Sequence, residues 1–274
     1  MKKSLLLAAL FVCISVVCFA QKTANSVLVG QLYGTQPSSF FDKLKGRVKE
    51  LKQTNYLAGE KHGKPVKVRI LTTEDRITAP SGKDYFEEYD QFGTILKCGV
   101  LDENGKLLEY WDVDADSGKI LQAFYYVNDI LRYDIKVKYQ GNNLVETNYY
   151  QPGTNILMKG IKYNYDEFGN RTKFQFINSA NMVISYNVYT YNTQGLVESM
   201  KAYNRAGFMT AIYSYTYNSK GHRITQHQET LADGDKRDYV FKYKFDKMGN
   251  YTRVVYYKDN KPLIYRERQI KYYK

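Results

Sequence analysis

A five-residue turn motif recurs along most of this 274-residue chain and constrains its fold more than any other feature. The motif is an aromatic residue, Asp or Asn, two variable residues and glycine. The Asp or Asn accepts a hydrogen bond from the backbone two residues on, and the glycine adopts the positive φ that a type I turn with a bulge requires. The chain therefore reverses at each copy. The copies span residues 89–93, 165–169, 191–195, 217–221 and 245–249.

The motif is periodic over the last four copies, whose glycines lie 26, 26 and 28 residues apart. Weaker reversal signals lie between the copies, for example Pro152 with Gly153 and Asp233 with Gly234. Turns therefore fall roughly every 11–16 residues from Gly93 onward, which is typical of short antiparallel strands and of repeat architectures.

The segments between turns alternate with period two. Tyr213, Tyr215 and Tyr217 share one face of their segment, and the segment 239–245 places aromatic residues on one face and Val240, Lys242 and Lys244 on the other. Aromatic and β-branched residues also favour strands. We therefore predict an all-β fold, a long antiparallel meander of repeated hairpins that forms a curved or wrapped sheet. The pattern leaves open whether this sheet closes on itself.

The first twenty residues resemble a secretory signal peptide. Lys2 and Lys3 precede an apolar run over 5–17, and small residues end at Ala20, so cleavage is expected before Gln21. A transmembrane helix is the alternative, but the apolar run is too short. No small residue precedes Cys13 or Cys18 as a lipoprotein signal requires. The mature chain then retains only Cys98, so we expect an exported protein without an internal disulfide, in the periplasm, at the cell surface or secreted.

Residues 21–84 precede the repeats, which we assign to residues 85–274. Ser38 and Ser39, the apolar residues that follow them and Gly46 predict a short capped N-terminal helix. The chain is expected to enter its first strand near Arg47 and to continue through a hairpin and an irregular loop. The helix either plugs one end of the sheet or binds a partner.

The segment from Tyr163 to Arg171, which reads Tyr-Asn-Tyr-Asp-Glu-Phe-Gly-Asn-Arg, resembles the YD repeat of the Rhs family. The resemblance covers roughly residues 85–274. The copy at Asp166 matches best, and those at Asn192 and Asn218 depart from the pattern. In large Rhs and toxin proteins such repeats form a sheet that spirals into a hollow shell, which implies a shorter wrapped strip here. The Asp-Pro core motif and toxin tail of those proteins are missing, so toxin delivery is not implied. Small exported proteins of Bacteroidetes-like bacteria show a similar organisation.

The chain is basic, with a formal net charge of +12, which signal removal lowers to +10. Such a charge can attract nucleic acid, acidic polysaccharide or a phosphate-rich membrane surface. The alternative is a solvated outer face whose charges protect exposed strands from aggregation, and the even spread of the lysines favours it. Export makes nucleic acid an unexpected partner.

The candidate chemical sites are few. Asp112, Asp114 and Asp116 alternate before a turn and would project from one strand face, as an oxygen cage for Ca²⁺ or as a solvated acidic turn. An EF-hand loop would need Gly and Glu where the chain has Ser117 and Ala123. The three histidines, His62, His222 and His227, show no metal-ligand spacing.

The sequence contains no recognisable catalytic arrangement. Cys98 has no nearby histidine that indicates a catalytic pair, and a buried thiol is the commoner role. We see no phosphate loop, serine elbow or zinc motif. We therefore predict that the protein is not an enzyme and needs no cofactor, apart from the calcium possibility.

Two functions remain. In the first, rows of tyrosine, of which the chain has 28, stack on a glycan or contact a protein at the cell envelope, while Lys and Arg engage anionic groups. In the second, the tyrosines form the core of a structural or accessory envelope protein. A membrane-spanning barrel is disfavoured because lysines neighbour the Tyr-rich faces, the turns are short and the chain ends in Lys274. The candidate binding residues are Tyr163, Tyr165, Tyr189, Tyr191, Tyr213, Tyr215, Tyr217 and Tyr243.

Overall fold

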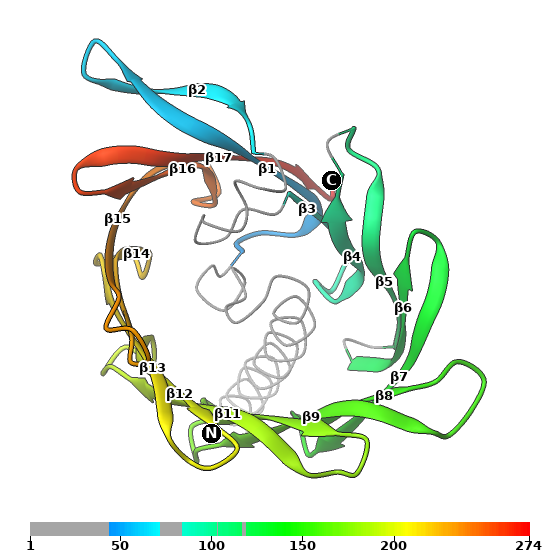
Figure 1. The fold of residues 1–274 in the computed structure, drawn as a ribbon. Coiled ribbons are helices and arrows are strands. Elements are labelled where there is room, and N and C mark those ends of the chain that lie inside the picture. The colour runs from blue at the N-terminus through cyan, green and yellow to red at the C-terminus, as the bar shows by residue number, and fades with distance from the viewer. Residues whose placement is uncertain (1–43, 72–83, 103, 117–118) are drawn as a thin grey trace, which may run out of the picture.

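The structure is a computed structural model that describes residues 44–71, 84–102, 104–116 and 119–274. Every regular element among these residues is a β-strand, and all of the strand pairs are antiparallel (Figure 1). No helix long and apolar enough to cross a membrane occurs in the described ranges. The strands are β1 (Val48–Lys61), β2 (Lys64–Ile70), β3 (Tyr85–Tyr89), β4 (Ile95–Leu101), β5 (Leu107–Asp116), β6 (Lys119–Val127), β7 (Ile130–Gln140), β8 (Asn143–Tyr150), β9 (Leu157–Tyr165), β10 (Arg171–Asn178), β11 (Val183–Tyr191), β12 (Val197–Asn204), β13 (Met209–Tyr217), β14 (Arg223–Thr230), β15 (Lys236–Phe245), β16 (Tyr251–Lys258) and β17 (Lys261–Tyr272).

The sheet closes into a barrel of sixteen strands. Strands β3 to β17 pair with their chain neighbours, and β1 pairs with β3 on one side and β17 on the other. The seam between β1 and β17 runs in register from Val48 opposite Tyr272 to Leu57 opposite Ile264. Figure 1 looks along this barrel and shows its strands arranged as a ring.

The all-β part of the predicted fold is confirmed, but the predicted curved or wrapped sheet with a short N-terminal helix is wrong. A barrel has no free edges along its wall. The strand that closes it, β1, comes from the segment before the repeats. Period-two alternation is the same in an open and a closed sheet, so the pattern could not reveal closure. The predicted helix and signal peptide lie almost wholly outside the described residues; Leu44, Lys45 and Gly46, at the described end of that helix, are not helical.

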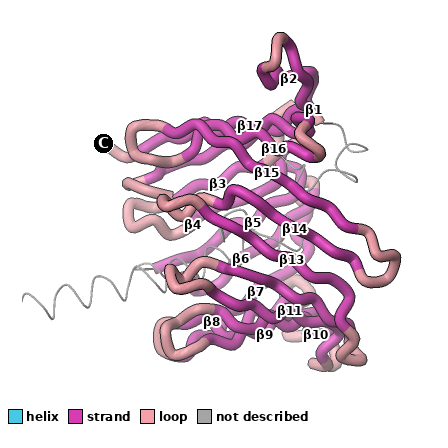
Figure 2. The backbone as a smooth tube through the Cα atoms, turned by 90° about the vertical axis from the view of Figure 1, so that its left-hand side faces the viewer, coloured by secondary structure: helices cyan, strands magenta, loops and turns pink. Residues whose placement is uncertain are grey.

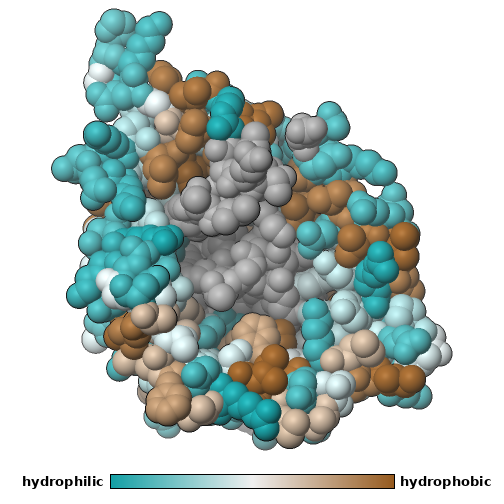
Figure 3. All heavy atoms as spheres, in the orientation of Figure 1, coloured by the Kyte–Doolittle hydropathy of each residue, from teal (hydrophilic) through white to brown (hydrophobic). Residues whose placement is uncertain are grey.

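Strand β2 stands outside the barrel. The second half of β1 leaves the wall and pairs with β2, from Ala58 opposite Lys67 to Lys61 opposite Lys64. The resulting hairpin projects from the barrel (Figure 2). It is mostly hydrophilic and occupies the upper left of Figure 3.

The turn motifs adopt the predicted conformation. In the copy that begins at Tyr217, Asn218 Oδ1 accepts the backbone N–H groups of Lys220 and His222, both at 3.0 Å. Gly221 has φ +81°, and the other four motif glycines have φ between +69° and +82°. The strand register shifts directly beside the turn, between Thr216 and Tyr217. The Asp or Asn of each copy and its glycine therefore set the reversal together with the bulge, as the sequence predicted.

Arg268 identifies the inner face of the wall. Its guanidinium carbon lies 3.7 Å from the ring centre of Tyr251 on β16, and its Nη2 donates to Tyr85 Oη on β3 at 2.6 Å. Side chains from strands that are not neighbours meet where they converge, which is the concave face. Most of the buried apolar side chains share this face, and the outer face carries most of the ion pairs.

Candidate functional site

The inner wall carries all eight tyrosines that the sequence singled out. They come from β9, β11, β13 and β15, whose period-two alternation turns one row of rings inward. Tyr163, Tyr189 and Tyr215 are buried, and the other five are half-buried. The structure therefore gathers the predicted residues on one continuous surface, and that surface faces the barrel interior.

Four of these tyrosines use their hydroxyl groups inside the protein. Each donates to a backbone carbonyl about one repeat earlier, at a bulge that follows a turn. The four hydrogen bonds are Tyr165 Oη to Leu144 O at 2.6 Å, Tyr191 to Arg171 at 2.7 Å, Tyr217 to Val197 at 2.6 Å and Tyr243 to Arg223 at 2.7 Å. Burial raises the pKa of the Tyr165 and Tyr191 hydroxyls, so they stay protonated donors. These contacts tie successive hairpins together.

Two arginines that follow the turns stack between rings on the same wall. The guanidinium carbon of Arg171 lies 5.2 Å from the ring centre of Tyr189 and 5.3 Å from that of Phe174. Arg223 lies 4.5 Å from the ring centre of Phe241 and 5.6 Å from that of Tyr215. The negative faces of the rings stabilise these cations away from bulk water. The inner wall thus alternates rings with positive charge.

The rings line the wall and do not fill the barrel with one core. The buried residues form three separate clusters, over β1 and β3–β9, over β11–β13, and over β15–β17 with the neighbouring Leu71. The strands with extensive mutual contact are neighbours in the sheet or adjoin the seam. Barrels of this strand number are too wide for side chains to fill them from wall to wall. The inner face can therefore serve as a binding surface.

A polar network holds the seam of the barrel. Asn55 Oδ1 accepts from Arg266 Nε at 2.7 Å, and Gln53 Oε1 accepts from Arg268 Nε at 3.0 Å. The Asp84 carboxylate accepts from the backbone N–H of Asn55 at 2.7 Å and from its side-chain amide at 3.1 Å. These side chains are buried, and charged groups survive burial only when partners satisfy them. The network joins β1 and β17, the first and last strands of the barrel wall.

An aromatic group, which we call the Trp111 cluster, lies on the inner wall of β5 to β8. It consists of Trp111, Tyr125, Tyr133 and Tyr149. Trp111 meets Tyr125 edge-on at 6.0 Å between ring centres, Tyr125 stacks on Tyr133 at 5.9 Å, and Tyr133 meets Tyr149 edge-on at 5.6 Å. Lys159 of β9 extends over it, with its ammonium 4.7 Å from the centre of the Tyr133 ring and 4.9 Å from that of Tyr149.

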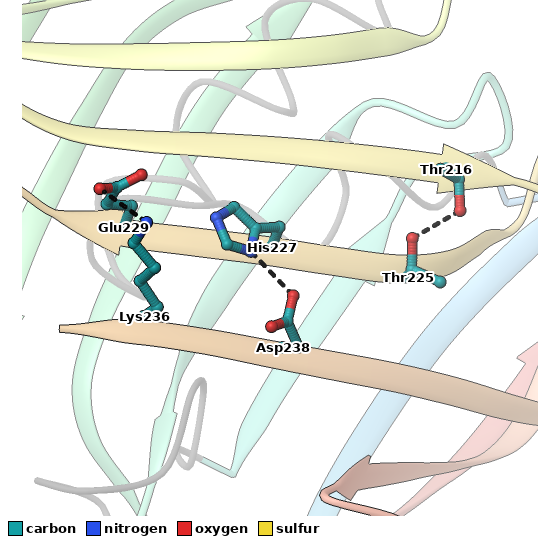
Figure 4. Close-up of polar contacts among 6 residues, drawn as sticks. All are labelled: Thr216, Thr225, His227, Glu229, Lys236 and Asp238. Atoms are coloured by element: carbon teal, nitrogen blue, oxygen red, sulfur yellow. Dashed lines mark hydrogen bonds and ion pairs between the residues drawn. The ribbon is translucent and has the colours of Figure 1, made fainter.

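The outer face of β13 to β15 carries a ladder of polar pairs (Figure 4). The pairs are formed by residues directly opposite in the sheet register. Thr216 and Thr225 hydroxyls lie 2.5 Å apart, His227 Nδ1 lies 2.8 Å from Asp238 Oδ1, and Lys236 Nζ lies 3.3 Å from Glu229 Oε1. Each ionisable side chain of the ladder is paired with a neighbouring side chain on the same surface. The ladder therefore resembles a solvated face more than a catalytic centre.

The predicted acidic group lies on the outer face of β5. Asp112 forms an ion pair with Lys97 at 2.8 Å, and Asp114 Oδ2 accepts from the Gln122 amide at 3.3 Å. Within the described ranges, no three His, Cys, Asp or Glu side chains are placed to hold a metal ion. Asp116 ends the strand on the same side. The neighbour of the Asp112 carboxylate is therefore a lysine ammonium, and that of the Asp114 carboxylate is a side-chain amide.

The histidines and the cysteine lie apart from one another. His62 is in the turn of the projecting hairpin, His222 packs on Phe245 inside the barrel, and His227 is on the outer face. Cys98 is fully buried on the inner wall, and burial, followed by the charges of Glu87 and Asp112, raises the pKa of its thiol well above the usual value. A thiol of this kind is a packing group.

Sequence reasoning missed the cations of the inner wall, namely Lys159, Arg171, Arg223, Arg266 and Arg268. A usable signal exists in β17, where Arg266 and Arg268 alternate in phase with Ile264 and Ile270. Charged residues in the apolar phase of a strand predict a buried polar network. Arg171 and Arg223 each stand two residues after a motif glycine, which places them beside the tyrosines of the next repeat.

Comparisons with known proteins give no family. No family model and no curated protein match the chain. Among solved structures, a porin-like protein from Bacteroides vulgatus ATCC 8482 is 12% identical, with a TM-score of 0.34 over 83% of this chain and 99% of that one. One from Bacteroides uniformis ATCC 8492 is 8% identical, with a TM-score of 0.35 over the same shares. TcdB2-TccC3 without its hypervariable C-terminal region is 12% identical, with a TM-score of 0.32 over 78% of this chain. The chain spans only 12% of that structure's length, and none of these TM-scores establishes a common fold.

Proposed function

We propose that this protein is an exported, non-enzymatic binding protein of the cell envelope that takes up a ligand on the tyrosine-lined inner wall of its barrel. The observation that carries the proposal is a closed wall whose interior face alternates aromatic rings with cations. Flat rings and a few fixed charges are the usual lining of binding sites for ring-shaped, polar ligands. A glycan or a protein segment at the cell envelope is the proposed partner.

A second candidate is a structural or accessory envelope protein whose tyrosine rows serve only the fold. The hydroxyl contacts of Tyr165, Tyr191, Tyr217 and Tyr243 favour it, because those four groups are already satisfied by the backbone. In this case partners contact the outer face or the projecting hairpin of β1 and β2. The YD-repeat resemblance is compatible with either function.

The outer face supports a location in an aqueous part of the envelope. A barrel embedded in lipid presents an apolar band outward, and charges there are costly. This barrel presents the ion pair of His227 with Asp238 and that of Lys97 with Asp112 on the outer face of its strands. We therefore propose a periplasmic or surface-associated protein. Release from cells by osmotic shock or a carbonate wash is expected, and recovery only in detergent extracts of the outer membrane would contradict this location.

A glycan array of neutral and acidic oligosaccharides, read together with quenching of tyrosine emission by iodide, separates the two functions. The binding function predicts array hits and strong quenching, because a ligand can bind the inner rings only where solvent also reaches them. The structural function predicts no hits and weak quenching. Circular dichroism of the same preparation, dominated by β-structure, verifies that the protein tested is folded.

A further inference from the structure

We propose that the Trp111 cluster and Lys159 form a subsite for an acidic sugar, in which the ring of the sugar lies against the tyrosines and its carboxylate binds the lysine ammonium. This inference rests on the proposed function of the inner wall and names the ligand class for one part of it.

The rings provide a surface of suitable size and chemistry. Tyr125 and Tyr133 are half-buried and nearly parallel, with 18° between their planes, so the accessible part of this ring pair offers apolar aromatic surface to a ligand. The C–H bonds on one face of a pyranose ring are weakly positive and are attracted to the negative face of an aromatic ring. Tyr125 Oη donates to Glu109 Oε2 at 2.9 Å, which fixes the orientation of the ring.

Lys159 supplies a charge that has no anionic partner. Its ammonium contacts Tyr133 and Tyr149 and forms no ion pair with any residue in the described part of the chain. On the outer face, Lys97 and Lys236 pair with carboxylates, whereas Lys173 and Lys242 lie over the rings of Tyr186 and Tyr257. The Lys159 side chain is exposed as a whole, and desolvation lowers the pKa of its ammonium. An incoming carboxylate would restore its counter-charge.

Trp111 gives a second, independent indication of a ligand. Its side chain is only 2% exposed, and its Nε1 donor has no acceptor among the residues that the structure describes. Buried donors without a partner are rare in folded proteins, and each requires a physical explanation. A sugar hydroxyl or ring oxygen that reaches this edge of the cluster would accept the hydrogen bond.

The aromatic rings, the Lys159 ammonium and the Trp111 indole N–H together favour one class of ligand over others. A small inorganic anion would use the ammonium but not the rings, and an uncharged aromatic compound would use the rings but leave the charge unpaired. A sugar that bears a carboxylate uses both, and its hydroxyl groups can satisfy the indole N–H and the neighbouring polar groups.

The test uses Trp111, the only tryptophan of the chain, as its reporter. Short oligomers of galacturonic acid and of hyaluronan are titrated into the full mature protein while tryptophan emission is recorded. Their methyl esters, which remove only the charge, are the matched ligands. The variants are Lys159→Gln, Lys159→Arg and Lys173→Gln; the last removes an outer-face lysine that lies 4.4 Å from the Tyr186 ring centre and serves as the control.

We expect a saturable change in emission with at least one acidic oligomer, affinity lowered roughly tenfold or more by esterification or by Lys159→Gln, and little change for Lys159→Arg or Lys173→Gln. Equal binding of acid and ester, unaffected by Lys159→Gln, would overturn the acidic subsite while leaving a glycan-binding wall intact. Equal losses in Lys159→Gln and Lys173→Gln would show diffuse attraction to a basic protein and would also overturn it. No response to any oligomer, together with an empty glycan array, would overturn both proposals.

Discussion

The hydroxyl of Tyr217 donates a hydrogen bond to the backbone carbonyl of Val197, 2.6 Å away and one repeat earlier in the chain. The same hydrogen bond recurs at three other repeats. Each one links a hairpin to the preceding hairpin at a β-bulge, where the hydrogen bonding between the strands is irregular. The tyrosine of the turn motif therefore has a structural task apart from any ligand. Its ring faces the barrel interior, while its hydroxyl completes the wall.

Tyr217→Phe should destabilise the protein by about 1 kcal/mol, because the buried carbonyl of Val197 loses its donor while the ring remains. Urea unfolding followed by circular dichroism measures the change. Tyr203→Phe is the matched control, since Tyr203 stacks on Tyr186 at 4.8 Å on the outer face and its hydroxyl forms no such contact within the described part of the chain. Equal losses of stability in the two variants would refute the fastening role.

Asn218→Ala should cost roughly 1–2 kcal/mol of unfolding free energy, because two backbone N–H groups lose the side-chain oxygen that they share. The neighbouring substitution Ser219→Ala changes an exposed position of the same turn and should have almost no effect. Thermal and urea unfolding of both variants test this. If Asn218→Ala were as stable as Ser219→Ala, the side chain would not determine the turn.

Arg268→Met should destabilise the protein by roughly 3 kcal/mol, since it removes hydrogen bonds to Gln53 and Tyr85 and a stacked cation from the buried seam. Lys173→Met on the outer face, which also removes a cation from a ring, should cost well under 1 kcal/mol. Unfolding by urea compares the two. A seam that tolerates Arg268→Met as easily as Lys173→Met does not depend on this network.

Alkaline pH should unfold the protein through its inner tyrosines. Burial is the main reason that the pKa of Tyr139 rises to about 12 and those of Tyr89 and Tyr149 rise well above the usual value. The folded state binds these protons more tightly than the unfolded state, whose tyrosines titrate near pH 10. The stabilising contribution is therefore complete below about pH 10 and is lost as the pH rises toward 12 and above.

Absorbance at 295 nm and urea unfolding between pH 8 and pH 12 measure both sides of this linkage. We expect part of the tyrosine signal to appear only together with loss of β-structure, while the free energy of unfolding falls from about pH 10 upward. Titration of every tyrosine near pH 10 in a protein that stays folded would contradict the burial of these rings.

The sequence predicted local structure well because each turn is specified by residues within it. Asn218 and Gly221 need no distant partner to reverse the chain, and the alternation of Tyr213, Tyr215 and Tyr217 reports a shared face directly. The inward tyrosine rows were therefore accessible to sequence reasoning. Their position on the inner face of a closed barrel was not, since the pattern of a strand does not specify the curvature of the sheet.

Closure depends on contacts between the two ends of the chain. The pairing of Lys52 with Gln269 joins segments more than two hundred residues apart, and no sequence motif predicts it. The segment before the repeats contains no copy of the turn motif. Its strand β1 was therefore not recognisable as the strand that lies between β3 and β17. Lys159 was missed for a related reason: only the folded wall brings its ammonium over rings from β7 and β8.

Cross-linking of the seam tests the central claim, a closed barrel with an interior tyrosine wall, most directly. Lys52 and Gln269 are opposite one another on β1 and β17, and Thr216 and Thr225 are opposite on neighbouring strands of one hairpin. Each pair is replaced by cysteine, mild oxidant is added, and non-reducing electrophoresis with intact mass reports intramolecular disulfides; the fully buried Cys98 stays in place. The closed barrel predicts a disulfide in both double variants. A disulfide at Thr216→Cys/Thr225→Cys without one at Lys52→Cys/Gln269→Cys would show that the sheet is open.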